Sequence, residues 1–434
     1  MSVRRVRACV AGAAGALLFT SLTTLGTVAG TPVAPPAQAG TGHHHKPWSP
    51  APGITFNNPL LPKRSHVINK KVRMAISNTR KGETIRLMTW NLKSALFTRA
   101  IVNAHRRGVG VRVIMSAGLA RGQSGHGSYA TIKRALSNGN RGRPARLKSW
   151  IHTCHDSCRG RHGIVHSKFF LFSKVGGAKD IVMSASGNLT EVAANRQWDD
   201  LTTIVNRPKT YRNFGMIFAQ ASRDKPVRPA YHQFTDGSLE GWFYPRMGQR
   251  DTILKLLAPV HCKGAIGAAA NHTTVIRIAQ AVFNGKRGLH IAQRLRQLYN
   301  QGCNIRIDYT AMANSSQRVL APVPKRHIVQ DFDGDGLYDR YLHMKAIAIN
   351  GHYGKDHSHK VVLNGSANWS GMSLKSDEQG LILHRPRAVT QYINWINHIF
   401  EHPPPRPKVV APTTRRTPDG RIVKINPYAH VELD

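Results

Sequence analysis

Two short stretches each place a histidine and a lysine two residues apart in apolar surroundings. The stretch "GIVHSKFFLF", residues 163–172, carries His166 and Lys168, and "YLHMKAIAI", residues 341–349, repeats the arrangement. Because side chains alternate along a strand, both polar groups of a pair should point to one face. An imidazole can act as a nucleophile or exchange a proton, and an ammonium can neutralise an anion. The second copy argues against a chance occurrence.

Each pair is followed by a hydroxyl, an amide and an acid. These residues are Ser186, Asn188 and Asp199 after the first pair, and Ser366, Asn368 and Glu378 after the second pair, His343 and Lys345. A site that cleaves a phosphodiester must neutralise the nonbridging oxygens, present a nucleophile and protonate the departing alcohol. The two copies together supply all three functions. Alternatively, the histidines and lysines are core residues, and the segments that follow them are ordinary turns. The sequence also leaves open whether Asp199 or its neighbour Asp200 is the acid of the first copy.

The pairs belong to an internal duplication of about 180 residues. His166 and His343 lie 177 positions apart, and Asn188 and Asn368 lie 180 apart. Hydrophobic periodicity predicts a strand, a helix and a strand before each pair. The predicted ranges are 83–92, 95–108 and 109–117, then 272–283, 289–302 and 303–310. We therefore expect an α/β protein with two similar α/β/α halves, 67–240 and 241–402, with mainly parallel central sheets around a pseudo-twofold axis.

The doubled His-x-Lys with a downstream Gly-Ser-x-Asn resembles the phospholipase D superfamily, over roughly residues 70–400. The sequence "GSANWS" at 365–370 is a close match, whereas the first half has Ala185 in place of the usual glycine. The family's aspartate, five residues beyond each lysine, is replaced by Ser173 and Asn350. The His-to-Asn separations of 22 and 25 residues exceed the family's usual spacing and predict a lengthened hairpin in each half.

The resemblance implies a phosphodiesterase that works through a covalent phosphohistidine intermediate without a metal cofactor. It favours His166 as nucleophile and His343 as acid/base, although pseudo-symmetry leaves the reverse open. Asp199 and Glu378 would orient the imidazoles. The phosphate-binding residues would be Lys168, Lys345, Ser186, Ser366, Asn188 and Asn368.

The ends of the chain have a different composition from the duplicated region. Arginines precede an Ala/Leu/Val/Gly-rich stretch that ends at Ala37-Gln38-Ala39, which predicts a secretory signal peptide over 1–39, with a membrane anchor as the alternative. A Pro/Gly/His-rich leader, 40–66, follows, and order is expected from Val67. A Pro/Arg-rich tail, 403–434, is expected to be extended and is assigned no chemistry. The mature protein is expected to be extracellular.

Cysteine usage is consistent with export. Four cysteines remain after the signal, and the natural pairing joins Cys154 to Cys158 and Cys262 to Cys303, one of three connectivities. The alternative is a zinc site at the first pair, because histidines surround it in "IHTCHDSCRGRHG".

An acidic loop precedes the second His-x-Lys pair. In "DFDGDGLYDRYLHMK", residues 331–345, acidic residues match positions 1, 3, 5 and 9 of a calcium loop, but Leu342 at position 12 cannot be a ligand. A structural calcium ion and an acidic surface turn are both consistent with this pattern. The candidate ligands are Asp331, Asp333, Asp335 and Asp339.

The formal net charge of +40, from 62 Lys and Arg against 22 Asp and Glu, favours polyanionic partners. A simpler explanation of the net charge is that surface lysines and arginines keep the protein soluble. Export favours a secreted phospholipase D that hydrolyses or transphosphatidylates phospholipid headgroups at a membrane surface. The charge favours a nonspecific, metal-independent endonuclease, and a non-catalytic polyanion-binding protein is a third alternative. We expect a monomer with an internal pseudo-dimer.

Overall fold

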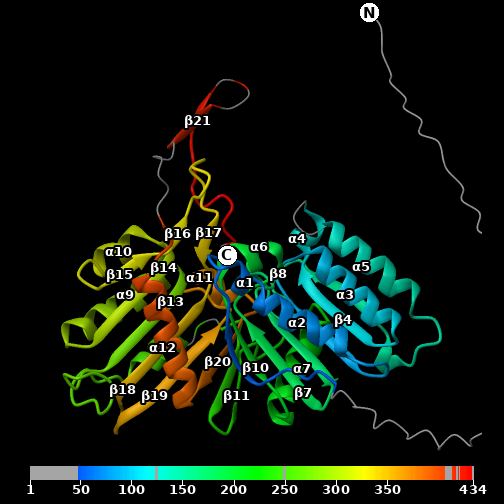
Figure 1. Cartoon of the computed structure of the whole chain (residues 1–434), viewed down its shortest axis with the longest axis horizontal. Helices are drawn as coiled ribbons and strands as arrows, with labels where there is room; N and C mark the ends of the chain where they lie inside the picture. Colours follow the sequence, from blue (N-terminus) through cyan, green and yellow to red (C-terminus); the bar gives the residue numbers. More distant parts are fainter. Residues whose placement is uncertain are drawn as a thin grey trace, which may run out of the picture. The chain divides into compact units, whose positions relative to one another are not determined.

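The computed structural model describes residues 47–122, 126–246, 248, 251–405, 413–416, 419 and 421–432. Two mixed sheets dominate the described chain (Figure 1). The first has the order β1 (Gly53–Phe56), β10 (Asp200–Ile204), β7 (Ala178–Ala185), β6 (Phe169–Val175), β2 (Thr84–Met88), β4 (Gly110–Ser116) and β5 (Trp150–Cys154). Its helices are α1 (Pro62–Ser65), α2 (Val67–Asn78), α3 (Ala95–Arg106), α4 (Ala117–Arg121), α5 (His126–Asn138), α6 (Glu191–Asn195) and α7 (Pro208–Ala221), with a 3-10 turn at Ala145–Leu147.

The second sheet repeats this plan. Its order is β11 (His232–Asp236), β12 (Leu239–Phe243), β20 (Gln379–Leu383), β19 (Asp356–Gly365), β18 (Lys345–Tyr353), β13 (Val275–Phe283), β14 (Asn304–Met312) and β15 (Lys325–His327). Its helices are α8 (Thr252–Leu257), α9 (Gly285–Asn300), α10 (Asn314–Val319), α11 (Gly371–Lys375) and α12 (Pro386–Glu401). The predicted duplicated α/β fold is confirmed.

Three small sheets complete the described fold. They pair β3 (Leu92–Lys93) with β8 (Leu189–Thr190), join β16 (Val329–Gln330), β17 (Arg340–Leu342) and β9 (Gln197–Trp198), and pair β21 (Thr414–Arg416) with β22 (Ile422–Lys424). The three-stranded sheet matters most for the site, because β9 belongs to the first half and β17 to the second.

The predicted strand–helix–strand units form as expected. In α3, buried Phe97 and Ile101 lie on one helix face, and the Ser94 hydroxyl caps its start by accepting from the Phe97 amide at 3.3 Å. Each helix is followed by a glycine with positive φ, Gly108 (φ 87°) after α3 and Gly302 (φ 96°) after α9, which suits a helix C-terminus.

The expectation of mainly parallel sheets is wrong. In the two large sheets the parallel pairs are the strands joined through helices, β2 with β4, β4 with β5, β13 with β14 and β14 with β15. Tight turns join β6 to β7 and β18 to β19, so these hairpins are antiparallel, and β6 and β18 pair antiparallel with β2 and β13.

The two halves share a core. One apolar cluster contains Phe169 and Val182 of the first half and Ala346, Val362 and Tyr392 of the second. The described residues of both halves belong to one compact unit.

Order begins earlier than the sequence suggested. Residues Gly53–Phe56 form β1, which pairs antiparallel with β10 at the edge of the first sheet, so the expectation of order from Val67 is wrong. The signal peptide prediction, 1–39, lies outside the described residues. Within the described part of the chain, no helix has both the length and the apolarity to cross a membrane.

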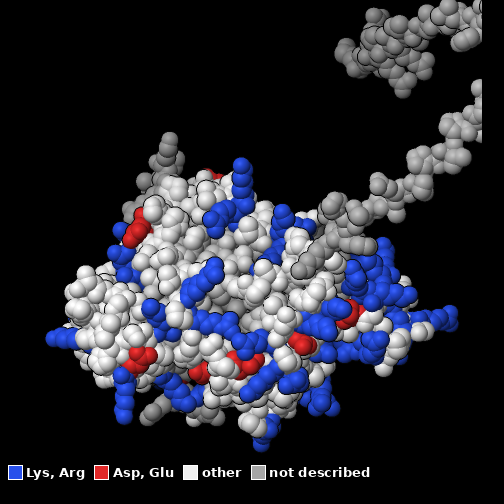
Figure 2. Space-filling view, turned by 60° about the horizontal axis from the view of Figure 1, so that its bottom comes forward, with Lys and Arg blue, Asp and Glu red and all other residues white. Residues whose placement is uncertain are grey.

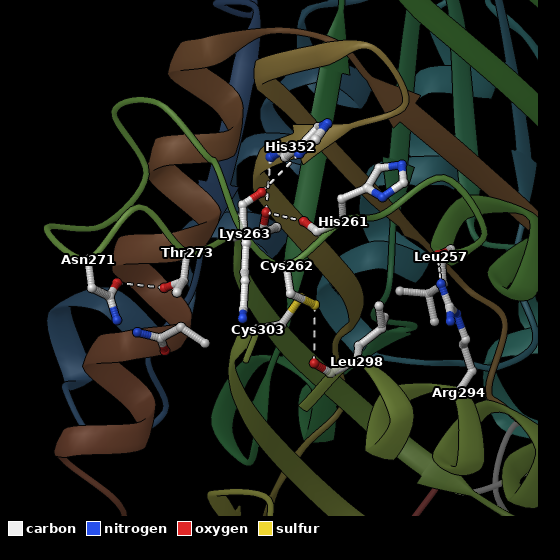
Figure 3. The surroundings of a disulfide bond; sticks show 12 residues. Leu257, His261, Cys262, Lys263, Asn271, Thr273, Arg294, Leu298, Cys303 and His352 are labelled. Atoms are coloured by element: carbon white, nitrogen blue, oxygen red, sulfur yellow. Dashed lines mark hydrogen bonds between the residues drawn. A yellow bond between two sulfur atoms is a disulfide. The ribbon is translucent and has the colours of Figure 1, made fainter. Parts of the chain in front are cut away.

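Both disulfides form with the natural pairing. Cys154 joins Cys158, which contradicts the zinc alternative because a disulfide leaves no thiolate for a metal. Cys262 joins Cys303, the residue before β14, and Figure 3 shows the Leu298 carbonyl of α9 beside this bond.

Candidate active site

The histidines of the two His-x-Lys pairs lie just before their long strands, not inside them. β6 begins at Phe169 and β18 begins at Lys345, so His166, Lys168 and His343 occupy the approach to a strand. The prediction of both pairs within strands is corrected here. The reason is that these approaches pair with the other half: the His166 amide donates to the Asp377 carbonyl, and the His343 amide donates to the Trp198 carbonyl, both at 3.0 Å.

This exchange brings each acid to the histidine of the opposite half. His166 Nδ1 lies 3.0 Å from both carboxylate oxygens of Glu378, and His343 Nδ1 lies 3.0 Å from Asp199 Oδ1. Asp199, rather than its neighbour Asp200, makes this contact, since Asp200 accepts from the Tyr392 hydroxyl. A hydrogen bond from Nδ1–H to a carboxylate fixes the tautomer and leaves Nε2 for chemistry.

The two serines contact the acids. The Ser186 hydroxyl donates to Asp199 Oδ1 at 2.8 Å, and the Ser366 hydroxyl donates to Glu378 Oε2. Each hydroxyl also accepts the amide of the residue after the acid, at 2.9 Å for Asp200 and 3.0 Å for Gln379. A hydroxyl has a single proton to donate, so these serines hold the acids in place and do not match the predicted phosphate donors.

The lysines and asparagines complete the cluster. Lys168 Nζ donates to the His166 carbonyl at 2.6 Å, and Lys345 Nζ donates to the His343 carbonyl at 2.5 Å. Asn368 Oδ1 accepts from Gln280 Nε2 at 3.5 Å. All eight residues predicted to be catalytic are buried, and every one of them is at most 2% exposed.

The second ring nitrogen of each imidazole is not used by the acids. Nε2 of His166 and Nε2 of His343 are buried, and neither has a hydrogen-bond partner among the described residues. Burial, followed by the positive charges of Lys345 and Lys168, lowers the pKa of His343 well below its ordinary value. Burial raises the pKa of Asp199 to about 6, against the opposing effect of Lys345. Lys168, in the first half, therefore lowers the pKa of His343, in the second half.

Glycines create the space that the acids occupy. A Cβ on Gly187 would lie 2.5 Å from Asp199 Oδ2, and a Cβ on Gly365 would lie 2.2 Å from the Gln379 carbonyl oxygen. Both distances are shorter than a non-bonded contact allows, so larger residues would displace the acid-bearing segments. Ala185, where the family usually has glycine, is accommodated as a buried residue.

Several contacts of the site were not expected from the sequence. Gln379 holds Lys168 from both sides, accepting its amide at 2.9 Å and donating to its carbonyl at 3.1 Å. The Trp90 ring packs edge-on against His166, 5.6 Å between centroids, with Lys168 Nζ 5.9 Å from the ring centre. Glu432, in the tail that was assigned no chemistry, accepts from Asn188 Nδ2 at 2.8 Å. In the sequence, the only feature that could have indicated Glu432 as a site residue is that it is acidic in a basic chain.

The acidic loop retains three of its four candidate ligands in one cluster. Carboxylate oxygens of Asp331, Asp333 and Asp335 lie within 4.8 Å of one another, whereas Asp339 accepts from the Phe332 amide and from Arg196. Calcium binding stays a prediction, to be tested by whether a chelator lowers the melting temperature.

The model of the cardiolipin synthase, PLD-like domain family matches residues 72–221 and 266–400, which are the two halves. The chain belongs to the phospholipase D superfamily. Members of this superfamily act as phosphodiesterases or phosphotransferases, generally without a metal. No curated protein matches the chain in sequence.

Solved structures with low sequence identity share the fold. Phosphatidylserine synthase from Haemophilus influenzae Rd KW20 is 12% identical, with a TM-score of 0.53 over 80% of this chain and 85% of that one. Polyphosphate kinase from Porphyromonas gingivalis is 14% identical, with a TM-score of 0.51 over 81% of this chain but only 50% of its own. Nuc, a phospholipase D family member from Salmonella typhimurium, is 21% identical over 40% of this chain and 96% of its own, with a TM-score of 0.30.

Proposed function

We propose that this protein is an exported phosphodiesterase of the phospholipase D type that acts on phospholipid headgroups. The observation that carries the proposal is the pair of buried imidazoles. Each is held at Nδ1 by an acid of the other half, and each has an Nε2 atom without a hydrogen-bond partner in the described part of the chain. Two lysines beside them supply the positive charge that an anionic phosphodiester requires.

The proposed reaction has two steps. Nε2 of one neutral histidine attacks phosphorus, and the other histidine, protonated, gives its proton to the leaving alcohol oxygen. That second histidine then removes a proton from water or an acceptor alcohol, which attacks the phosphohistidine and restores the first imidazole. The resemblance assigns the nucleophile to His166. The lowered pKa of His343 favours its neutral form before substrate binds, and a neutral imidazole also suits a nucleophile. Trapping of the phosphohistidine must therefore decide whether His166 or His343 is the nucleophile.

The phospholipid assignment is supported by the fold and by features that favour export. The similarity to a phosphatidylserine synthase covers most of both chains. Two disulfides and the predicted signal peptide favour an oxidising compartment outside the cell.

A nonspecific endonuclease is the second candidate, and the charge supports it. The chain carries a formal net charge of +40. Figure 2 shows Lys and Arg spread across one face with few Asp or Glu. Phosphate neutralisation dominates nucleic-acid affinity, so such a surface also suits DNA.

The test compares phosphatidylcholine vesicles with plasmid DNA, both in EDTA, using the wild type and two variants. We expect release of the headgroup, with His166→Ala and His343→Ala each lowering turnover by at least about 10³-fold. Quenching in alkaline denaturant, in which a phosphohistidine is stable, should trap a phosphoenzyme in the variant that retains the nucleophile. Plasmid cleavage without lipid turnover would favour the nuclease, and near-normal turnover by either variant would exclude the paired mechanism.

A further inference from the structure

The tail of the chain places a carboxylate in the candidate active site. Oε2 of Glu432 accepts from Asn188 Nδ2 at 2.8 Å and from Gln197 Nε2 at 3.0 Å. Oε1 of Glu432 accepts from Asn91 Nδ2 at 3.2 Å. Asn188 is a predicted phosphate ligand, so the carboxylate occupies a position suited to the nonbridging oxygens of a phosphodiester.

The three amide donors converge from three separate segments. Asn91 precedes β3, Gln197 begins β9, and Asn188 follows the β7 strand. Asn91 and Gln197 are at most 3% exposed. Buried amide groups that all donate toward one point form a binding site for an anion with at least two oxygens.

The segment that carries Glu432 is held by contacts outside the site. The Tyr338 amide donates to the Pro427 carbonyl at 2.8 Å, and the Tyr428 hydroxyl donates to the Thr310 carbonyl at 3.3 Å. The rings of Tyr338 and Tyr428 meet edge-on, 5.0 Å between centroids. The Glu432 amide itself donates to the Tyr341 hydroxyl at 2.9 Å. Figure 1 shows β21 and the red chain near it beyond the β16 and β17 strands.

The segment also borders a cavity that reaches Asn91. A cavity of about 1000 Å³ is lined by Asn91, Lys93, Arg99 and Arg196, with His430 and Glu432 forming part of its wall. Its Lys and Arg side chains suit an anionic substrate, although Glu191 also lines it, and both histidines are fully buried. The negative charge of Glu432 also acts on His343, since it opposes the lowering of the pKa of that imidazole.

We propose that Asn91 and Gln197, together with Asn188, bind the phosphate oxygens of the substrate, and that residues 421–432 are an autoinhibitory segment whose Glu432 carboxylate occupies this position. Substrate must displace the segment before the histidines can react. The proposal rests on the proposed phosphodiesterase function, because that function defines what Glu432 imitates. A competitor within the same chain raises KM and the apparent Kd for phosphate but leaves kcat unchanged.

The test uses the full-length chain with Glu432→Gln, Tyr428→Ala and the control Asp419→Asn. Asp419 is an exposed acid of the same tail that pairs with Arg421, so its variant removes the same charge away from the site. Calorimetric titration with inorganic phosphate should show Kd about tenfold lower for Glu432→Gln, and lower for Tyr428→Ala, with Asp419→Asn matching the wild type. In Glu432→Gln, a further Asn91→Ala or Gln197→Ala should weaken phosphate binding again.

Activity provides the second readout. For whichever lipid or DNA substrate is cleaved, Glu432→Gln should lower KM about tenfold and change kcat by less than about twofold. Equal phosphate Kd values in all variants with unchanged melting temperatures, or an equal gain in Asp419→Asn, would overturn the proposal. If Glu432→Gln binds phosphate more tightly but no substrate is turned over, the inhibitory segment is supported and the proposed phosphodiesterase function is refuted.

Discussion

At the scale of single residues, the site depends on acids that cross between the halves. Asp199 follows His166 in the chain but contacts His343, and Glu378 follows His343 but contacts His166. Each imidazole is therefore complete only when both halves are folded together. Asp200 is adjacent in sequence, yet it contacts Tyr392 on α12.

Removing either orienting charge should damage catalysis without removing the fold. We expect Asp199→Asn and Glu378→Gln each to lower kcat by about 10²- to 10⁴-fold, because the imidazole loses its fixed tautomer and the carboxylate that stabilises its cationic form. Steady-state kinetics on the cleaved substrate measures this. Asp200→Asn is the matched control and should stay within a few-fold of wild type. If Asp200→Asn lowered kcat more than Asp199→Asn, Asp200 would be the acid that orients the imidazole.

Asp377 should make stability depend on pH. Burial raises its pKa from 3.8 to about 7, against the opposing charge of Arg159. Between these two values the native state binds more protons than the unfolded state, so the free energy of unfolding falls as pH rises through this window, by up to about 1.4 kcal/mol per pH unit. Urea unfolding from pH 4.5 to 7.5 should show this slope in the wild type relative to Asp377→Asn. A difference between the two proteins that stays constant with pH would refute this assignment.

At the scale of elements, the halves are joined where each one passes a short segment beside the other. β17 of the second half runs parallel to β9 of the first, with Tyr341 opposite Gln197. Val165 of the first half likewise forms a parallel bridge to Asp377 of the second. These two reciprocal pairings set the backbone positions of both histidines.

The two disulfides should contribute unequally to stability. The 41-residue separation of Cys262 and Cys303 predicts a loss of about 4 kcal/mol on Cys262→Ser/Cys303→Ser, against about 2 kcal/mol for Cys154→Ser/Cys158→Ser with its separation of 4. The reason is that a longer closed loop restricts the unfolded chain more. Denaturant unfolding of both double variants measures the losses, and full reduction should abolish the difference. A greater loss from the short loop would count against this entropic account.

At the scale of the whole molecule, charge determines which partners are attracted before chemistry begins. The basic face of Figure 2 gives a long-range attraction for polyanions that does not depend on the catalytic groups. This attraction does not determine which substrate is cleaved, because that depends on the residues of the candidate active site.

Polyanion binding should weaken steeply with salt. For a DNA duplex and His343→Ala, which should not cleave it, log K against log salt should fall with a slope of about −0.9 for each phosphate neutralised. Fluorescence anisotropy from 50 to 300 mM salt gives the slope. Vesicles of phosphatidylcholine alone, which carry no net charge, are the control and should show little dependence. A flat DNA titration would show that the excess charge serves solubility alone.

The sequence by itself determined the duplication and the strand–helix–strand units, because these depend on periodicity and on residue types that recur at fixed spacing. It predicted the residues of the candidate site, whereas the structure selected one of three possible disulfide pairings. Only the tertiary structure decided that the hairpins are antiparallel, that Ser186 and Ser366 contact acids, and that Glu432 reaches Asn188. These contacts join residues far apart in the chain. They follow from how the two halves pack together, which no local pattern encodes.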